Sequence, residues 1–523
     1  MIKNASEIEL ELQTLRDLVA AQAEQIAKME ALLKYYEEQF KLAQKLRFGA
    51  SSEKAEASKD QISFDSMFNE AEDQSDQTLP EPTYEEIKYK RRKRIGKRED
   101  DLTGLPVERI DYELPEEERI CTECGTMMND IGVDVRREVT IIPATAVVTE
   151  HARHAYGCPC CAEVGDRASI VTAESPAPLI AGSLASPSAV AHIAVQKYCD
   201  GIPLYRQEKS FQYDGVFFSR QTMANWLVRC AQNFLISIYS LLITFLLKEP
   251  VLHADETTVQ VLHEPGREAQ AKSYEWLYRT SGCSGHAIVI YEYRETRAHE
   301  HPKVFLSNFK GYLHSDGYQA YHNLPPGIIA VGCWAHARRP WKDLYDTIPK
   351  DKRAGSNAEL GLAYVNKLFA LEDKFRDLSP EERYEKRLEM SKPISDAYFN
   401  WASNLGALPK SLLGQAVSYS LSQREYLENV FLDGRLELSN NRAERSIKPF
   451  VQGRKQWLFS NTPNGAESSS IIYSIIETAK ENRLRPFHYL KYLLETLPNT
   501  TTSGLEALLP WSDSLPDSCR IPK

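Results

Sequence analysis

Long uninterrupted apolar runs are missing from this chain of 523 residues. The longest apolar run, Phe234–Leu247, is interrupted by Ser237 and Thr244, whereas a helix that crosses a bilayer needs about 20 apolar residues. The first residues, Met1–Glu7, lack the apolar core of a signal peptide. The sequence therefore predicts a cytoplasmic protein with no membrane partner, in which Phe234–Leu247 is a buried helix.

An excess of positive charge is also missing, because 73 acidic residues outnumber 63 basic ones. The net charge alone argues weakly against a nucleic-acid partner, but the charge is unevenly distributed. Residues 56–86 are strongly acidic, and a dense basic run at 88–98 includes Lys90, Arg91, Arg92, Lys93 and Arg94. A local basic stripe can bind phosphates whatever the total charge. In isolation a solvated charge cluster is equally reasonable, and the position of the run favours contact with the DNA backbone.

Glycine and proline are absent from residues 8–40, where core positions recur at alternating steps of four and three. These positions are Ile8, Leu12, Leu15, Val19, Gln22, Ile26, Met29, Leu33, Tyr36 and Phe40. The pattern predicts a coiled coil that forms a homo-oligomer. The alternative is an amphipathic helix packed on its own protein.

Ten cysteines are too few for a disulfide framework in a chain of this length. Four of them form two CxxC pairs, Cys121 with Cys124 and Cys158 with Cys161. Four thiolates at this spacing suit one structural Zn²⁺ ion, and Cys160 is the spare thiol because it does not keep the spacing. Buried or redox-active thiols are the alternative.

Residues 186–230 are expected to form three short helices separated by turns. Asp200–Pro203 and Asp214-Gly215 break the helical pattern, and Ser219 is placed to cap the third helix. The polar side of this third helix carries Arg220, Gln221, Asn225 and Arg229. Such an arrangement suits insertion into a DNA major groove, although similar helices occur in folds that bind no DNA.

The periodicity becomes that of β-strands from residue 251 onward. Strands are expected at 251–262, 273–280, 286–293, 311–315 and 327–333, with helices near 299–308 and 318–323. This order is that of a ribonuclease H-like core, in which acids on the first and fourth strands and on a later helix meet. Asp255, Asp316 and Glu444 occupy those three places.

The predicted core has a long insertion and two adjacent acids on its first strand. Residues 341–430 are too many for the simple core, and their apolar spacing predicts an inserted helical subdomain. Strand alternation puts Asp255 and Glu256 on opposite faces, and spacing alone does not choose between them. Hard oxygen ligands of this kind suit two Mg²⁺ (or Mn²⁺) ions, which phosphodiester displacement uses.

Two further motifs are expected to be structural. Cys333 and His336 offer only two metal ligands, so a structural role is favoured over a metal site. Asn440 and Asn441 stand where a helix cap belongs and would fix the start of the helix that carries Glu444.

The chain resembles the IS66 family of insertion-sequence transposases, within the wider DDE group. The resemblance rests on the heptad pattern, the two CxxC pairs and the following motifs: Phe48–Lys54, His253–Thr257, His314–Tyr318, Cys333–Arg339, Asn440–Arg445 and Leu508–Trp511. A departure is Pro340-Trp341, where the family usually has a basic-aromatic pair.

This resemblance implies a choice of Asp255 over Glu256, with Asp316 and Glu444 as its partners. It implies that two divalent ions held by these carboxylates cut the transposon ends and then activate the freed 3′-hydroxyl to attack target DNA. Double-stranded DNA is the implied substrate, and accessory proteins of the same element are possible partners. Cations near Glu444 are candidates to offset phosphate charge, unless they form only an exposed basic face: Arg445, Lys448, Arg454 and Lys455.

The expected architecture is a multidomain α+β protein. Its parts are a coiled coil (1–47), an acidic linker that ends in the basic run (48–100), a zinc-binding module (101–170), a helical DNA-binding region (171–248), a catalytic core (249–340 and 431–485), the helical insertion (341–430) and a C-terminal tail (486–523). Two rival functions remain: a nuclease that only hydrolyses DNA, and a zinc-containing DNA-binding protein with an inactive nuclease-like core.

Overall fold

The computed structural model of the chain describes residues 22, 29, 145–157, 170–500 and 502–522. The chain divides into two compact units, residues 1–58 with 151–521 and residues 59–150 with 522–523, and the elements described below belong to the first. The linker and the basic run lie outside the described residues, as do Cys121, Cys124, Cys158 and Cys161. Of the heptad positions only Gln22 and Met29 are described, and both are helical and exposed.

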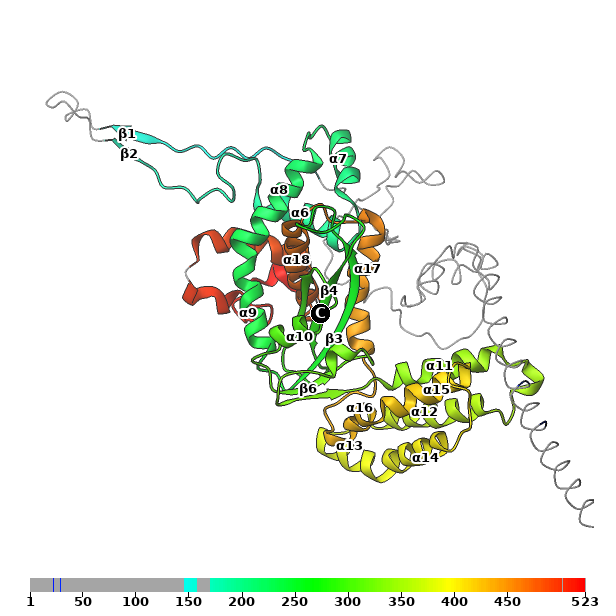
Figure 1. The fold of residues 1–523 in the computed structure, drawn as a ribbon. Coiled ribbons are helices and arrows are strands. Elements are labelled where there is room, and N and C mark those ends of the chain that lie inside the picture. The colour runs from blue at the N-terminus through cyan, green and yellow to red at the C-terminus, as the bar shows by residue number, and fades with distance from the viewer. Residues whose placement is uncertain (1–21, 23–28, 30–144, 158–169, 501, 523) are drawn as a thin grey trace, which may run out of the picture. The chain divides into compact units, whose positions relative to one another are not determined.

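A five-stranded mixed sheet forms the centre of this unit (Figure 1). Its strands are β3 (Val251–Gln260), β4 (Lys272–Thr280), β5 (Val289–Arg294), β6 (Gly311–His314) and β7 (Ile328–Val331). Their order is β5-β4-β3-β6-β7; β3 pairs antiparallel with β4, as β4 does with β5, while β6 is parallel to both β3 and β7. All five strands were predicted from the sequence, although β5 begins later and β7 ends earlier than expected.

A separate hairpin of β1 (Ala155–Gly157) and β2 (Ile170–Thr172) precedes the helices. Between the sheet strands lie α10 (Glu300–Phe305) and a short 3₁₀ turn, Gln319–Tyr321, close to the predicted positions.

Both edges of the sheet are covered by side chains that bond to the strand backbone. At β5, the hydroxyls of Ser474 and Thr478 accept hydrogen bonds from the amides of Tyr291 (2.8 Å) and Val289 (3.0 Å). At β7, the side-chain amide of Asn429 donates to the Ala330 carbonyl at 2.8 Å. These bonds protect both edge strands from pairing with strands of other chains.

Three helices lie where the sequence predicted them before the sheet. They are α6 (Pro187–Tyr198), α7 (Leu204–Tyr213) and α8 (Arg220–Cys230). Ser186 and Ser219 cap α6 and α8 by accepting hydrogen bonds from Ala189 and Thr222 amides. The predicted polar side chains of α8, namely Arg220, Gln221, Asn225 and Arg229, are exposed.

A π-helical turn joins α8 to α9 (Ile236–Leu246), which makes one long helix from Arg220 to Leu246. By length and composition alone this helix could cross a membrane. However, Ile238, Leu242 and Leu246 are fully buried, and the helix packs against α18 and β5. One side of Phe234–Leu247 is therefore buried inside the protein, as predicted, whereas Ile236 on the same helix is exposed.

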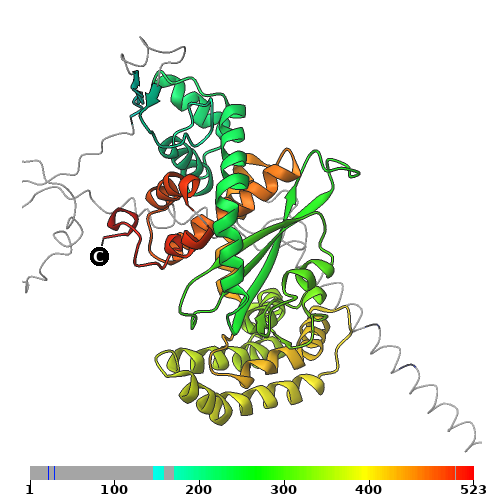
Figure 2. The same cartoon turned by 90° about the vertical axis from the view of Figure 1, so that its left-hand side faces the viewer.

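The segment between β7 and the Glu444 helix is helical, as its periodicity predicted. Figures 1 and 2 show these helices gathered in one group beside the sheet. They are α11 (Trp334–Thr347), α12 (Asn357–Lys374), α13 (Pro380–Lys386), α14 (Lys392–Ser403), α15 (Leu412–Ser422) and α16 (Arg424–Glu428). Their core includes Trp334, Trp341 and Tyr398 and also takes in Val251 and Val331 of the sheet. The Trp341 indole donates to the Tyr398 hydroxyl at 2.8 Å.

The chain then returns to the sheet through α17 (Asn441–Trp457), α18 (Pro463–Glu481) and α19 (Pro486–Thr496). Helix α17 packs along β3, and α18 packs along β5. The C-terminal residues continue as packed 3₁₀ turns, with Leu508, Leu509 and Leu515 buried. This arrangement brings Glu444, far away in the sequence, to the two strands that carry Asp255 and Asp316.

Candidate active site

The register of the two central parallel strands sets the first pair of acids. His253 of β3 pairs with His314 of β6, and Asp255 and Asp316 each follow two residues later. Because residues two apart share a strand face, the two acids are brought together just beyond the paired segment. Glu444 lies in the first turn of α17, which packs on β3. The fold thus gathers the three acids that the sequence singled out.

Electrostatics shows that these carboxylates interact. Burial raises the pKa of Asp255 well above its ordinary value, and three nearby carboxylates add to the rise: Glu256, Asp316 and Glu444. One opposing contribution is the hydrogen bond that Asp255 Oδ1 accepts from the Glu256 amide at 2.9 Å. A group of acids that repel each other in a partly buried place favours a bound cation.

Glu256, the alternative acid, has its own partners. Arg297 Nε donates to Glu256 Oε1 at 2.9 Å, and the Tyr321 hydroxyl donates to Oε2 at 2.5 Å. Burial raises the pKa of Glu256 to about 7, with Asp316 adding and Arg297 opposing. The Arg297 guanidinium also stacks 3.7 Å from the Tyr318 ring centre. Glu256 is therefore engaged in a local network, and it also lies close enough to Asp255 and Asp316 to interact with both electrostatically.

The loop that carries Asp316 is held from two sides. Asp316 Oδ1 accepts a hydrogen bond from the Tyr318 amide at 2.9 Å. On the other side Gly317 lies against α15, where an added Cβ would be 2.9 Å from the Tyr419 hydroxyl. The helical insertion thus closes on the loop, and a side chain at position 317 would displace Tyr419.

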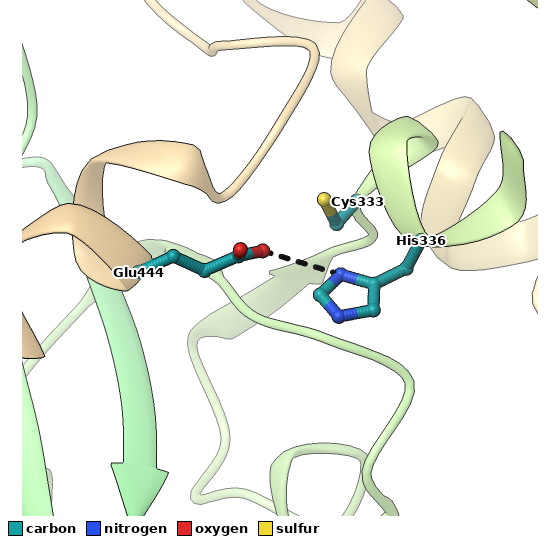
Figure 3. Close-up of side chains that lie close together, drawn as sticks. All are labelled: Cys333, His336 and Glu444. Carbon is teal, nitrogen blue, oxygen red and sulfur yellow. Dashed lines mark ion pairs between the residues drawn. The ribbon is translucent and has the colours of Figure 1, made fainter. Parts of the chain in front are cut away.

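Glu444 faces two residues at the start of α11. Its Oε1 lies 3.6 Å from Nδ1 of His336, and Figure 3 shows the Cys333 thiol beside them. The possible ligand atoms of Cys333, His336 and Glu444 all lie within 4.8 Å of one another. Among the described residues this is the one group of three metal-capable side chains that is so close; Asp255, Asp316 and Glu444 together are wider apart.

A buried polar network connects β3 and β6 to the segment before α17. The rings of His253 and His314 stack at 4.5 Å, and both side chains are fully buried. Asn440 bonds to Nδ1 of His253 at 3.0 Å and donates to the Ala254 carbonyl at 2.8 Å. The Glu437 amide donates to Nε2 of His314 at 3.1 Å. These bonds fix the segment before α17 to both strands and so position Glu444.

The cap prediction for Asn440 needs correction. Asn440 does occupy the cap position of α17, but its side chain makes no capping hydrogen bond. Its side chain is used instead by His253 and Ala254 on β3, because the residue is buried against that strand. Asn440 therefore fixes the start of the helix to the sheet rather than to its own first turn. Asn441 is exposed as the first residue of α17.

The predicted cations on α17 differ from each other. Arg445 is exposed and Lys448 is half-buried. Arg454 is tied to β3, where Nη1 donates to Thr258 Oγ1 at 2.9 Å, and burial lowers the pKa of its guanidinium. Arg454 thus lies on the face of α17 that meets the sheet, whereas Arg445 faces solvent.

Three residues near the acids were not predicted from the sequence: Arg297, Tyr321 and Tyr419. Each comes from an element without a marked motif, and each reaches the site through tertiary contacts. The signal that could have found Arg297 is its position directly after a strand of the core. His336 was noted in the sequence, but its contact with Glu444 was not foreseen.

The all-oxygen donor set of Asp255, Asp316 and Glu444 fits a hard divalent cation. Asp316 and Glu444 both raise the pKa of Asp255, and a bound cation would offset this repulsion. The described part of the chain therefore offers the chemistry that a Mg²⁺-class ion needs at this place.

Four family models match parts of the chain. The family model for "Transposase IS66 family" matches residues 182–468, and that for the "IS66 C-terminal element" matches 474–511. The "zinc-finger binding domain of transposase IS66" matches 118–162, and "Transposase C of IS166 homeodomain" matches 35–110.

Relatives in Sinorhizobium fredii extend the similarity. The uncharacterized protein y4qI is 32% identical over 401 residues, which span 73% of this chain and 71% of that protein. The uncharacterized protein y4jD is 30% identical over 422 residues, which span 77% of this chain and 80% of that protein. With more than half of its length matched by one family model, the chain belongs to the IS66 transposase family.

Proposed function

We propose that this transposase cuts transposon ends and joins them to target DNA at a site formed by Asp255, Asp316 and Glu444. The observation that carries the proposal is the electrostatic coupling of three acids from β3, the β6 loop and α17. The strand order β5-β4-β3-β6-β7 supports a ribonuclease H-like core. Membership of the family supports a role in transposition.

In this proposal the three carboxylates hold two Mg²⁺ (or Mn²⁺) ions, which supply activation of a water or 3′-hydroxyl and stabilise the leaving oxygen. Asp255 and Asp316 come from adjacent strands and are fixed by backbone amides at 2.9 Å. Asn440, bonded to His253, holds the α17 end and orients Glu444. Lys448, Arg445 and Arg454 add positive charge for the scissile phosphate, with Arg454 limited by its bonds to β3.

The substrate is double-stranded DNA, and we assign its contacts to two regions. The exposed polar face of α8 offers Arg220, Gln221 and Asn225 to a groove. The basic run Lys90–Arg94 contacts phosphates, and the cysteine pairs Cys121/Cys124 and Cys158/Cys161 hold one Zn²⁺ ion that folds the module between these regions.

The remaining organisation is proposed as the sequence predicts it. Residues 249–340 and 431–485 form the catalytic core, residues 341–430 form the insertion, and the coiled coil at 1–47 makes a homo-oligomer in the cytoplasm. An oligomer would bring two active sites to the two ends of one element. Accessory proteins of the same element are possible additional partners.

The test is Asp316→Asn in the full chain, with DNA that carries the ends of the element. Cleavage should fall by roughly 100-fold or more, as expected when one charged contact to a reacting centre is removed. DNA binding in a gel-shift assay should persist, because Asp316 is not part of the proposed binding surfaces. Asp373→Asn is the matched control, since Asp373 is 72% exposed in a surface ion pair.

Each outcome of this test decides between the functions. Cleavage retained in Asp316→Asn would overturn the site assignment. Cleavage by the wild-type chain without joining would favour a hydrolysis-only nuclease. DNA binding with no cleavage by the wild-type chain, with Mg²⁺ or Mn²⁺ and both transposon ends present, would favour an inactive core.

A further inference from the structure

We propose that Cys333, His336 and Glu444 form a binding site for a transition metal ion of the Zn²⁺ class. The proposal goes beyond the carboxylate site, because a thiol and an imidazole take part. The three side chains come from the start of α11 and the start of α17 and point toward one another (Figure 3).

The spacing of the ligand atoms fits such an ion. Zn²⁺ binds sulfur at about 2.3 Å, and nitrogen and oxygen at about 2.0–2.2 Å, so tetrahedral ligand atoms stand roughly 3.3–3.8 Å apart. Nδ1 of His336 and Oε1 of Glu444 are 3.6 Å apart. All ligand atoms of the group lie within 4.8 Å. A small rotation of the side chains would complete the geometry.

Two helix starts meet at this place. Cys333 is the cap residue of α11, and Asn440 is the cap residue of α17. The Trp334 amide donates to the Leu438 carbonyl at 3.0 Å, which ties the two starts together. The N-terminal end of a helix carries partial positive charge that favours anionic groups, and here both ends favour the thiolate and carboxylate that a metal requires.

The thiol is already oriented by the backbone. Cys333 Sγ accepts a hydrogen bond from the Asn440 amide at 3.1 Å. Amides of Ala335 and His336 also face the sulfur and oppose the rise that burial causes in its pKa. Such amide bonds to sulfur fix the orientation of a ligand and stabilise its ionised form. Cys333 and His336 are three residues apart at a helix start, so their side chains share one face.

The imidazole nitrogen that faces Glu444 lacks a hydrogen bond. Nδ1 of His336 is buried and forms no hydrogen bond within the part of the chain that the structure describes. The His336 side chain is 19% exposed and that of Glu444 is 15% exposed. A buried nitrogen without a hydrogen bond is costly, and a metal ion would satisfy it.

The ligand types select the ion. Thiolate and imidazole favour Zn²⁺, Co²⁺ and related ions, whereas Mg²⁺ and Ca²⁺ prefer oxygen ligands only. Three protein ligands leave a fourth position for water or another group. The site is therefore an open one for a soft or borderline divalent cation.

One consequence rests on the proposed function. Glu444 would belong to both sites, and an ion bound by Cys333 and His336 would draw its carboxylate toward α11. Zn²⁺ should then inhibit Mg²⁺-supported cleavage, and it should do so through Cys333.

The test uses the full-length, reduced chain after removal of metal, titrated with Co²⁺ and followed by absorption. Wild type and Cys283→Ser should bind one equivalent more than Cys333→Ser. The wild-type minus Cys333→Ser difference spectrum should contain a thiolate-to-cobalt charge-transfer band. Cys283 is an exposed free cysteine, which makes it the matched control. Any Co²⁺ bound by the paired cysteines cancels in the difference.

Equal stoichiometry and identical spectra for wild type and Cys333→Ser would overturn the proposal. Should Cys333→Ser fail to fold, as judged by circular dichroism, His336→Gln provides the same comparison and should weaken Co²⁺ binding by at least about 10-fold. Unchanged Co²⁺ affinity in a folded His336→Gln protein would also overturn the proposal.

A second readout separates this proposal from the proposed function. Asp255→Asn should lose cleavage but keep the cobalt band, since Asp255 is not one of the three ligands. In cleavage assays with Mg²⁺, Cys333→Ser should need at least about 10-fold more Zn²⁺ for half-inhibition than wild type. Equal Zn²⁺ concentrations for half-inhibition of wild type and Cys333→Ser would overturn the shared role of Glu444. The metal site itself is tested by the cobalt band alone.

Discussion

The fold contains two regions in which carboxylates are withdrawn from water, and they differ in what surrounds them. In the turn between β3 and β4, Glu264 is 5% exposed and accepts hydrogen bonds from Arg267, Ser273 and Tyr293. On the other side of β3, Asp255 faces further acids, and its pKa is raised by burial and by their charge.

This difference separates a structural acid from a functional one. A buried carboxylate with a cation and hydroxyl donors is satisfied within the protein. A carboxylate that faces carboxylates is not, and it is stabilised only when a proton or a metal ion arrives. The Asp255 region therefore stores unfavourable charge that ligand binding relieves, whereas the Glu264 region stabilises the fold without any ligand.

Asp255→Asn is expected to have the largest effect, because it changes the acid that faces other acids. Cleavage should fall by roughly 100-fold or more, because a ligand of the reacting centre is lost. In metal-free solution the same change should raise the free energy of unfolding by about 1 kcal/mol, since one of the repelling charges is removed. Thermal unfolding with and without Mg²⁺ measures the second effect, and the stabilisation by Mg²⁺ should shrink in the variant.

A metal-free Asp255→Asn protein that is less stable than wild type would contradict this view of the site. It would mean that the carboxylate is satisfied by the protein itself, as Glu264 is. Asp373→Asn serves again as control, because Asp373 is exposed in a surface ion pair and should change neither cleavage nor stability measurably.

Glu264→Gln tests whether the carboxylate with its own donors stabilises the fold. It should lower the free energy of unfolding by about 2 kcal/mol, because Arg267 loses its counter-charge and faces an amide donor in place of the carboxylate oxygen that accepted its hydrogen bond. Cleavage per folded molecule should remain close to wild type. Chemical denaturation measures the loss, with Glu389→Gln as control, since Glu389 is 65% exposed in a surface pair with Lys386. A neutral effect of Glu264→Gln would show that the network does not stabilise the fold.

Much of this arrangement could be predicted from the sequence because its signals are local. Ser186 and Ser219 cap helices that begin where the sequence predicted. The strand pattern of β3 marked Asp255 and Glu256 without choosing between them, and the end of the fourth predicted strand marked Asp316. The asparagine pair marked the start of the helix that carries Glu444. Such signals depend on neighbouring residues only, so periodicity and capping chemistry are enough to find them.

The parts that could not be predicted depend on contacts between distant segments. The alternation of β3 did not tell which of its two acids is paired, since that depends on Arg297 and Tyr321 reaching Glu256. Two ligands, Cys333 and His336, seemed too few for a metal site until Glu444 came within 3.6 Å of the imidazole. The closure of α15 on Gly317 through Tyr419 likewise has no local signal.

A third buried acid, Glu275 of β4, sharpens the comparison because it lacks the cation and the set of donors that surround Glu264, and the charged group near it is Glu292. Its side chain is 1% exposed, and neither carboxylate oxygen has a hydrogen-bond partner within the described residues. Burial raises the pKa of Glu275 well above its ordinary value. The folded protein therefore keeps this proton at a pH at which the unfolded chain has lost it.

The sign of the pH effect follows from this proton. Below the ordinary carboxyl pKa of about 4.3, both states are protonated and Glu275 has no effect on stability. As the pH rises above that value, the unfolded chain ionises first, so the free energy of unfolding falls until the folded group ionises too. Glu275→Gln removes the titration, and its stability relative to wild type should grow by about 1 kcal/mol between pH 5 and pH 8. Denaturation of both proteins at the two pH values measures this, and a constant difference would mean that the fold does not raise the pKa of Glu275.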